Sequence, residues 1–138
     1  MDRSALLVVL AVALGSNIAV SADRDSAANL AGEYRMQGKG LGPNDSPYDG
    51  TCSLSGEGPT YDVSCYNRET QHTYSGRGLA SGDALAVFIG DYLSGDHNAV
   101  FTGEYLVLYR RRADGVLEGT WTEAQRRAIG KETLTPMR

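Results

Sequence analysis

The sequence predicts an all-β protein in which about eight antiparallel strands form an up-and-down β-barrel behind an N-terminal signal peptide. Three observations predict this fold class. The two cysteines fit a single hairpin register, short alternating polar and apolar segments recur between turn residues, and no apolar pattern has the length of a core helix. Consecutive hairpins favour an up-and-down barrel, which also removes exposed strand edges.

The hairpin register is clearest between Tyr48 and Asn67. Antiparallel partners keep a constant sum of residue numbers, and the register that pairs Cys52 with Cys65 also pairs Leu54 with Val63. It leaves a four-residue turn, and both cysteines fall on the apolar face because side chains alternate along a strand. We therefore expect a Cys52–Cys65 disulfide, as is usual for paired cysteines in an exported chain.

Residues 1–22 have the organisation of a secretory signal peptide. A short start containing Arg3 precedes an apolar run from Ala5 to Leu14, and Val20-Ser21-Ala22 is a small-residue cleavage site. The alternative is a membrane anchor, but the run is about half of the ~20 apolar residues that a span requires. The sequence therefore predicts a periplasmic or secreted protein with no membrane span after cleavage.

The rest of the chain is predicted to be one domain. Residues 23–29 are polar with alanines and are expected to form a flexible lead-in, and residues 30–138 are expected to form the barrel. The formal net charge of −4 argues against a nucleic-acid partner.

The first half of the barrel is predicted as follows. A strand over residues 32–38 is followed by a Gly- and Pro-containing loop and the cysteine hairpin. The strand over residues 71–79 has two glycines on the face of Tyr74, which indicates a bend or a close approach. After a tight turn, residues 84–89 form an apolar strand, and residues 90–98 are expected to be a loop.

The second half contains three predicted strands. Residues 99–110 form a strand with a bulge at Gly103, and an Asp-Gly turn leads to a strand over residues 116–122. A polar connection over residues 123–130, with room for one helical turn, precedes a closing strand over residues 131–135.

Bulky side chains are expected to fill most of the barrel interior. An eight-stranded barrel has room either for packed side chains or for one small ligand. The size of the inward-facing residues favours a filled interior, with recognition by the rim or the loops. These interior candidates are Tyr34, Met36, Leu54, Tyr61, Val63, Tyr74 and Trp121.

No catalytic constellation is evident in the sequence. A metal site near His97 is conceivable because Asp91 and Asp96 are close in sequence, but loop acids beside a lone histidine are usually solvated, and we expect no metal and no cofactor. Glu132 shares the face of Leu134, and we expect it at the barrel mouth, bonded to a turn amide or an arginine.

Two groups of arginines also stand out, at residues 110–112 and 126–127. They flank opposite ends of one predicted strand, so we do not expect them to form a single anion site.

The chain from Gly32 to Pro136 resembles the calycin-like secreted barrels of the lipocalin and avidin type. Gly32-x-Tyr34 stands where those families have Gly-x-Trp, and Leu117-Glu118-Gly119-Thr120-Trp121 followed by a last strand is similar to their closing segment. The segments Tyr74–Gly78, Gly82–Val87 and Asp114–Trp121 resemble small uncharacterised bacterial exported proteins. These resemblances imply a barrel binding module, and the avidin ligand pattern is not matched, so biotin is not implied.

The segment from Ser26 to Tyr34, with a disulfide in the next hairpin, resembles the periplasmic inhibitors of bacterial metalloproteases. Those proteins are also small eight-stranded barrels, and the segment before their first strand enters the protease cleft. The resemblance implies an inhibitory role for residues 23–29, with Ser26, Ala27, Ala28 and Asn29 as the candidate inhibitory residues. This chain departs from the family in having Tyr34 in place of Trp and a tighter cysteine spacing.

The sequence thus favours a non-enzymatic exported binding module for an unknown protein or a small apolar ligand. A metalloprotease inhibitor that acts through residues 23–29 is the alternative.

Overall fold

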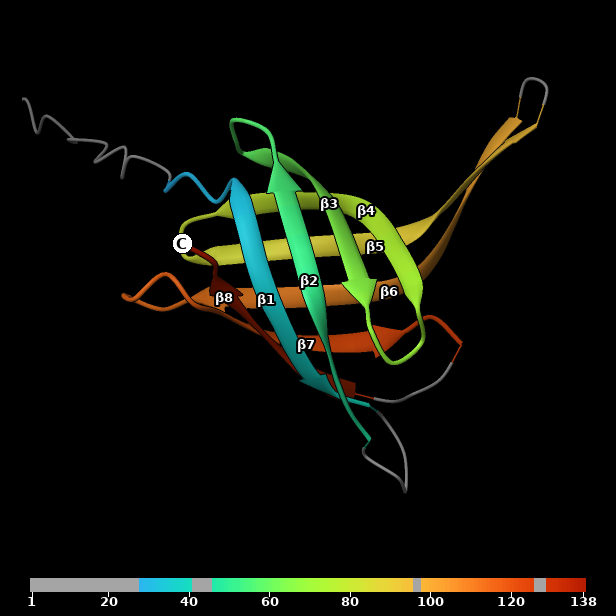
Figure 1. Ribbon diagram of the computed structural model, residues 1–138. Coiled ribbons are helices and arrows are strands. Elements are labelled where there is room, and N and C mark those ends of the chain that lie inside the picture. The colour runs from blue at the N-terminus through green and yellow to red at the C-terminus, as the bar shows by residue number, and fades with distance from the viewer. Residues whose placement is uncertain (1–27, 41–45, 96–97, 126–128) are drawn as a thin grey trace, which may run out of the picture.

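Eight antiparallel strands form a closed barrel in which each strand pairs with its sequence neighbours and the last strand pairs with the first (Figure 1). The computed structural model describes residues 28–40, 46–95, 98–125 and 129–138. The strands are β1 Gly32–Lys39, β2 Pro47–Ser55, β3 Thr60–Asn67, β4 His72–Ser81, β5 Ala84–Gly95, β6 Asn98–Arg111, β7 Leu117–Glu123 and β8 Ile129–Pro136. The all-β, up-and-down barrel predicted from the sequence is confirmed. In the described ranges, no helix has the length and apolar character needed to cross a membrane.

The register of the cysteine hairpin is also confirmed. β2 and β3 pair Cys52 with Cys65 and Leu54 with Val63, and the two cysteines are joined as a disulfide. Both lie in the core with Leu54 and Val63, while Ser64 on the opposite face is exposed. One alternating pattern therefore decides both the thiol pairing and the side of the hairpin that faces inward.

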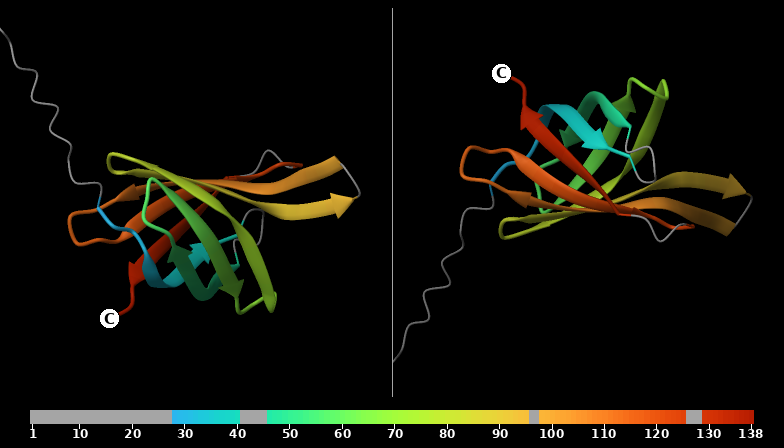
Figure 2. Two further views of the ribbon diagram at one scale, coloured as in Figure 1. Left: turned by 90° about the horizontal axis from the view of Figure 1, so that it is seen from above. Right: turned by 90° about the horizontal axis from the view of Figure 1, so that it is seen from below.

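The loop expected over residues 90–98 is wrong for most of its length. β5 continues to Gly95 and β6 begins at Asn98, so the β5–β6 hairpin extends past its neighbours and projects from the barrel (Figures 1 and 2). Tyr92 and the residues that pair with this stretch, Val100, Phe101 and Thr102, favour strand over loop, although two aspartates and two glycines suggested a loop. The predicted bulge is confirmed, because the register shifts where Gly90 pairs with Gly103.

The other boundaries need small corrections. β1 extends to Lys39, β4 begins at His72 and ends at Ser81, and β8 begins at Ile129, two residues before the predicted closing strand. The expected close approach at the β4 glycines is confirmed, because a Cβ on Gly76 would overlap the main chain of β5.

The barrel has two different ends. At one end, which we call the closed end, lie the start of β1 and the β2–β3, β4–β5 and β6–β7 turns. Leu30, just before β1, is buried there: its N–H donates to the Tyr61 hydroxyl (3.3 Å), and its carbonyl accepts from the Tyr34 hydroxyl (2.7 Å). At the opposite end, the open end, lie the β3–β4 turn and the base of the β5–β6 hairpin.

Candidate functional site

A pocket of about 180 Å³ lies inside the open end of the barrel. Its wall comes from all eight strands, since each contributes at least one residue. The lining is mostly apolar and aromatic, with one carboxylate and no cationic side chain among the described residues. The lining residues are Met36, Gly40, Tyr48, Cys65, Asn67, Thr70, Tyr74, Ile89, Tyr105, Val107, Trp121 and Glu132.

Four aromatic rings form a continuous series along this wall. Trp121 is the centre of the series: its ring centroid is 5.5 Å from that of Tyr105 and 6.4 Å from that of Tyr48. Tyr105 in turn lies 5.6 Å from Tyr74. Neighbouring rings are steeply inclined to each other, which is the edge-to-face geometry that aromatic pairs prefer. The wall is therefore a packed aromatic arrangement and not a set of independent side chains.

Three glycines provide the space for the large rings at this end. Tyr48 is the register partner of Gly38, and Trp121 is the partner of Gly130. In each pair, a Cβ on the glycine would overlap the aromatic ring, so the ring lies across the bare backbone of the adjacent strand. Tyr109 lies over its partner Gly119 in the same way. Glycine placement thus decides which way the rings lean.

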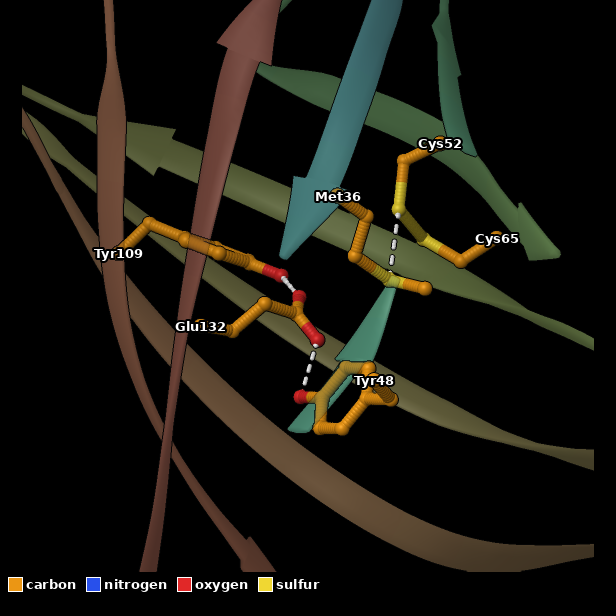
Figure 3. The surroundings of a disulfide bond; sticks show 6 residues. All are labelled: Met36, Tyr48, Cys52, Cys65, Tyr109 and Glu132. Carbon is orange, nitrogen blue, oxygen red and sulfur yellow. Dashed lines mark hydrogen bonds between the residues drawn. A yellow bond between two sulfur atoms is a disulfide. The ribbon is translucent and has the colours of Figure 1, made fainter. Parts of the chain in front are cut away.

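Glu132 of β8 is the polar centre of the site, between the two tyrosines that bond to it (Figure 3). The Tyr48 hydroxyl donates to Glu132 Oε2 at 2.7 Å, and the Tyr109 hydroxyl donates to Oε1. The inward orientation considered from the sequence is correct, but the expected partner, a turn amide or an arginine, is wrong. Two phenols satisfy this carboxylate because Gly38 and Gly119, the strand neighbours of Glu132, leave space for both rings.

The surroundings of Glu132 change the pKa of three groups. Burial raises the pKa of Glu132 above its usual value, and the hydrogen bonds from Tyr109 and Tyr48 oppose that change. Burial, followed by the negative charge of Glu132, raises the pKa of both Tyr109 and Tyr48. Both hydroxyls therefore stay protonated at neutral pH and act as hydrogen-bond donors.

The Trp121 indole has a buried N–H without a hydrogen-bond partner among the described residues. The nearby Tyr48 hydroxyl is not in hydrogen-bonding geometry with Nε1 and donates its own proton to Glu132. Leaving a buried donor unpaired costs about 1–3 kcal/mol. The Nε1 atom lies beside Gly130 of β8, where a Cβ would overlap it, and it has no exposed surface in the pocket.

Two sulfur-containing residues, Met36 and the disulfide-bonded Cys65, form part of the pocket lining. Met36 Sδ also lies 3.5 Å from Sγ of Cys52, the other half of the disulfide (Figure 3). Neither sulfur carries a proton, so this contact is van der Waals packing of polarisable atoms and not a hydrogen bond.

The seven interior candidates divide between the two ends. Tyr34, Leu54, Tyr61 and Val63 are buried in the core outside the pocket. The three that line the pocket are Met36, Tyr74 and Trp121; the last two are partly buried and pack against the core. The interior is therefore filled at the closed end, as expected, but the open half contains a pocket that the size of these residues did not predict.

Sequence reasoning missed Tyr48, Tyr105 and Tyr109 and did not foresee the role of Glu132. Alternation alone could have placed Tyr105 with Val107 on an inward face, as it placed Glu132 with Leu134. The glycine–aromatic contacts could not be found in the same way, because they join residues on different strands that are far apart in the sequence.

The lead-in is described only at its end. Ser26 and Ala27 lie outside the described residues, Ala28 is partly buried, and Asn29 is exposed, with its side chain accepting from the Ala31 N–H at 3.0 Å. The inhibitory role of residues 23–29 stays a prediction.

Two other sequence expectations concern charged groups. Asp96 and His97, which were considered for a metal site, lie outside the described residues. Arg110 pairs with Asp83 at 2.8 Å, and Arg112 pairs with Asp114 and Glu118, each at 3.0 Å. These exposed arginines are paired, whereas residues 126–127 lie outside the described residues, so the expectation that the two groups do not form a single anion site stays a prediction.

No protein-family model matches the chain, and no curated protein is similar to it.

Proposed function

We propose that this protein is a non-enzymatic exported binding module that takes a small, largely apolar ligand into the open end of its barrel. The observation that supports this best is the aromatic pocket of about 180 Å³ above a filled core. Sites for drug-sized ligands usually occupy ~300–1,000 Å³. The size of the pocket therefore favours a ligand of few heavy atoms.

The architecture of the pocket supports binding over catalysis. Its polar groups are few, and the hydroxyls of Tyr48 and Tyr109 are both committed to Glu132. A catalytic site needs a nucleophile or base within hydrogen-bond reach of an orienting group and of a reacting atom. Glu132 has both oxygens engaged by phenols, so we assign it a positioning role for Tyr48 and Tyr109.

Export and a calycin-like relationship are part of the proposal. A disulfide between Cys52 and Cys65 is compatible with an oxidising compartment, and the apolar run in residues 1–22 is the basis for the signal peptide. The closed antiparallel barrel with one open end is consistent with lipocalin-type proteins, which is the relationship we propose.

The test is a fluorescence titration, because Trp121 is the only tryptophan in the chain and lines the pocket. A panel of small apolar and aromatic compounds is added to the protein that lacks residues 1–22. We expect a saturable change in emission with at least one member. No response in fluorescence and no heat in calorimetry across a varied panel would remove the proposal.

A matched pair of variants locates the binding. Thr70 lines the pocket, whereas Thr73 is exposed on β4, so Thr70→Phe narrows the mouth and Thr73→Phe makes the same change on the outer surface. We expect Thr70→Phe to weaken binding and Thr73→Phe to leave it unchanged. Equal affinities in both variants would place the ligand elsewhere.

A further inference from the structure

The lining of the pocket also indicates the chemical class of the ligand. We propose that the pocket binds a small organic cation, an alkylated ammonium group, between its aromatic rings and Glu132. This inference rests on the proposed function, since it specifies the ligand of the same pocket.

The aromatic wall is the first argument for a cation. Cation–π attraction acts when a cation lies within ~6 Å of a ring centroid, and tryptophan is the best partner. The centroid of Trp121 is 5.5 Å from Tyr105, and that of Tyr105 is 5.6 Å from Tyr74. At these spacings, one point in the pocket can lie within reach of several rings at once. A wall of this kind attracts alkylated ammonium groups, which are both cationic and apolar on their surface.

The second argument is that Glu132 lacks a positive partner. A buried carboxylate is normally paired with a cation, because burial disfavours its charged form. Here both oxygens accept from neutral phenols, and no lysine or arginine is among the described residues that line the pocket. A ligand cation would supply the missing positive charge and would stabilise the ionised carboxylate.

Two further carboxylates lie beside the aromatic wall. The Tyr105 hydroxyl donates to Glu123 at 3.4 Å. Burial, followed by the neighbouring Tyr74 and the charges of Glu123 and Glu104, raises the pKa of Tyr105 to about 12. The nearest lysines, Lys39 and Lys131, are exposed and alternate with inward-facing neighbours, so they point away from the interior. A cleft with one sign of charge concentrates ligands of the opposite sign.

The decisive experiment compares two molecules of the same shape. Choline and 3,3-dimethylbutan-1-ol differ only in having N⁺ or C at the branched centre, so they share the hydroxyl and most of the apolar surface. Both are titrated into the wild-type protein with Trp121 emission and calorimetry as readouts. We expect choline to bind about tenfold more tightly or better, the size of a desolvated cation–π and carboxylate contribution.

The outcomes separate the inference from the proposed function. Equal binding, or tighter binding of the neutral alcohol, overturns the cation inference and leaves the binding module intact. If neither compound binds but a neutral compound from the earlier panel does, the inference again fails alone. If no compound in either set binds, both fail.

A variant pair tests the role of the carboxylate. Glu132→Gln removes the negative charge in the pocket, whereas Glu33→Gln removes one from an exposed position on β1. We expect Glu132→Gln to lose the preference for choline over the neutral alcohol and Glu33→Gln to keep it. If Glu132→Gln folds poorly, Tyr105→Leu is the second variant, since it removes one ring of the wall. An unchanged preference in a folded form of either variant would contradict the inference.

Discussion

The two ends of the barrel use tyrosines in different ways. At the closed end, the hydroxyls of Tyr34 and Tyr61 bond to the main chain of Leu30, a residue outside the sheet. At the open end, the hydroxyls of Tyr48 and Tyr109 bond to the side chain of Glu132, which belongs to the sheet itself.

The difference shows how the same fold can be filled at one end and hollow at the other. A main-chain partner brings a covering segment with it, so Leu30 closes its end of the core. A carboxylate on a strand satisfies the phenols from within and needs no covering segment, so the interior above it stays accessible. The location of the hydrogen-bond partner, more than the size of the aromatic residues, thus decides which end can hold a ligand.

The largest expected effect tests the closed end. Leu117 is fully buried at the start of β7, and Leu117→Ala should lower the free energy of unfolding by about 2–5 kcal/mol because it leaves a cavity. Urea unfolding measures this change. Leu108→Ala on the exposed face of β6 is the control and should have little effect. The closed end does not line the pocket, so the folded Leu117→Ala variant should bind ligand with wild-type affinity. A lower affinity would contradict the separation of a structural end from a ligand-binding end.

The disulfide links the two regions, because Cys52 lies in the core and Cys65 also lines the pocket. The combined substitution Cys52→Ala and Cys65→Ala should lower stability by about 3 kcal/mol, the value for closing a short loop of sequence separation 13. The change is measured as a shift of the urea midpoint. Wild-type protein in a reductant should show the same loss, and no difference between oxidised and reduced protein would contradict the bond.

Gly130 sharpens the comparison at the open end. A Cβ at this position would overlap the Trp121 indole, so Gly130→Ala should displace the ring and lower stability by about 1–3 kcal/mol. We expect a shift in Trp121 emission and weaker ligand binding. In a Trp121→Leu background the same substitution should cost much less. An equal cost in both backgrounds would show that the ring is not what Gly130 accommodates.

A smaller effect concerns pH. Because burial raises the pKa of Glu132, the folded protein holds this proton more tightly than the unfolded chain. The resulting stabilisation is complete below the usual carboxyl pKa of 4.5 and is lost as pH rises through the native pKa. Between pH 4 and 8, wild-type stability should fall relative to that of Glu132→Gln. Parallel urea midpoints across this range would contradict a buried carboxyl at the open end.

The smallest effect belongs to the outer surface, which is common to both ends. Arg77 and Asp62 pair across β4 and β3 at 3.2 Å, but both side chains are largely exposed. Arg77→Ala should therefore change stability by less than about 1 kcal/mol and leave binding unchanged. A larger loss in urea unfolding would show that the exterior contributes to the difference between the ends.

The fold was predictable because its determinants are local. The alternation of Cys52, Leu54, Val63 and Cys65 specifies one register, and a one-residue slip would move every apolar side chain to the wet face. The β5–β6 hairpin was the exception. Tyr92, Val100 and Phe101 favour strand, whereas the two Asp and two Gly residues within 90–98 favour a loop.

The sequence by itself determined the all-β class, the cysteine register and the inward positions of Met36 and Trp121. Only the tertiary structure decided that Glu132 receives two phenols and that an aromatic pocket lies above it. The physical reason is that Gly38, Gly119 and Gly130 act on rings from adjacent strands, contacts that exist only once the strands are paired. Alternation reports which way a side chain faces, whereas the space in front of it depends on what the neighbouring strands leave open.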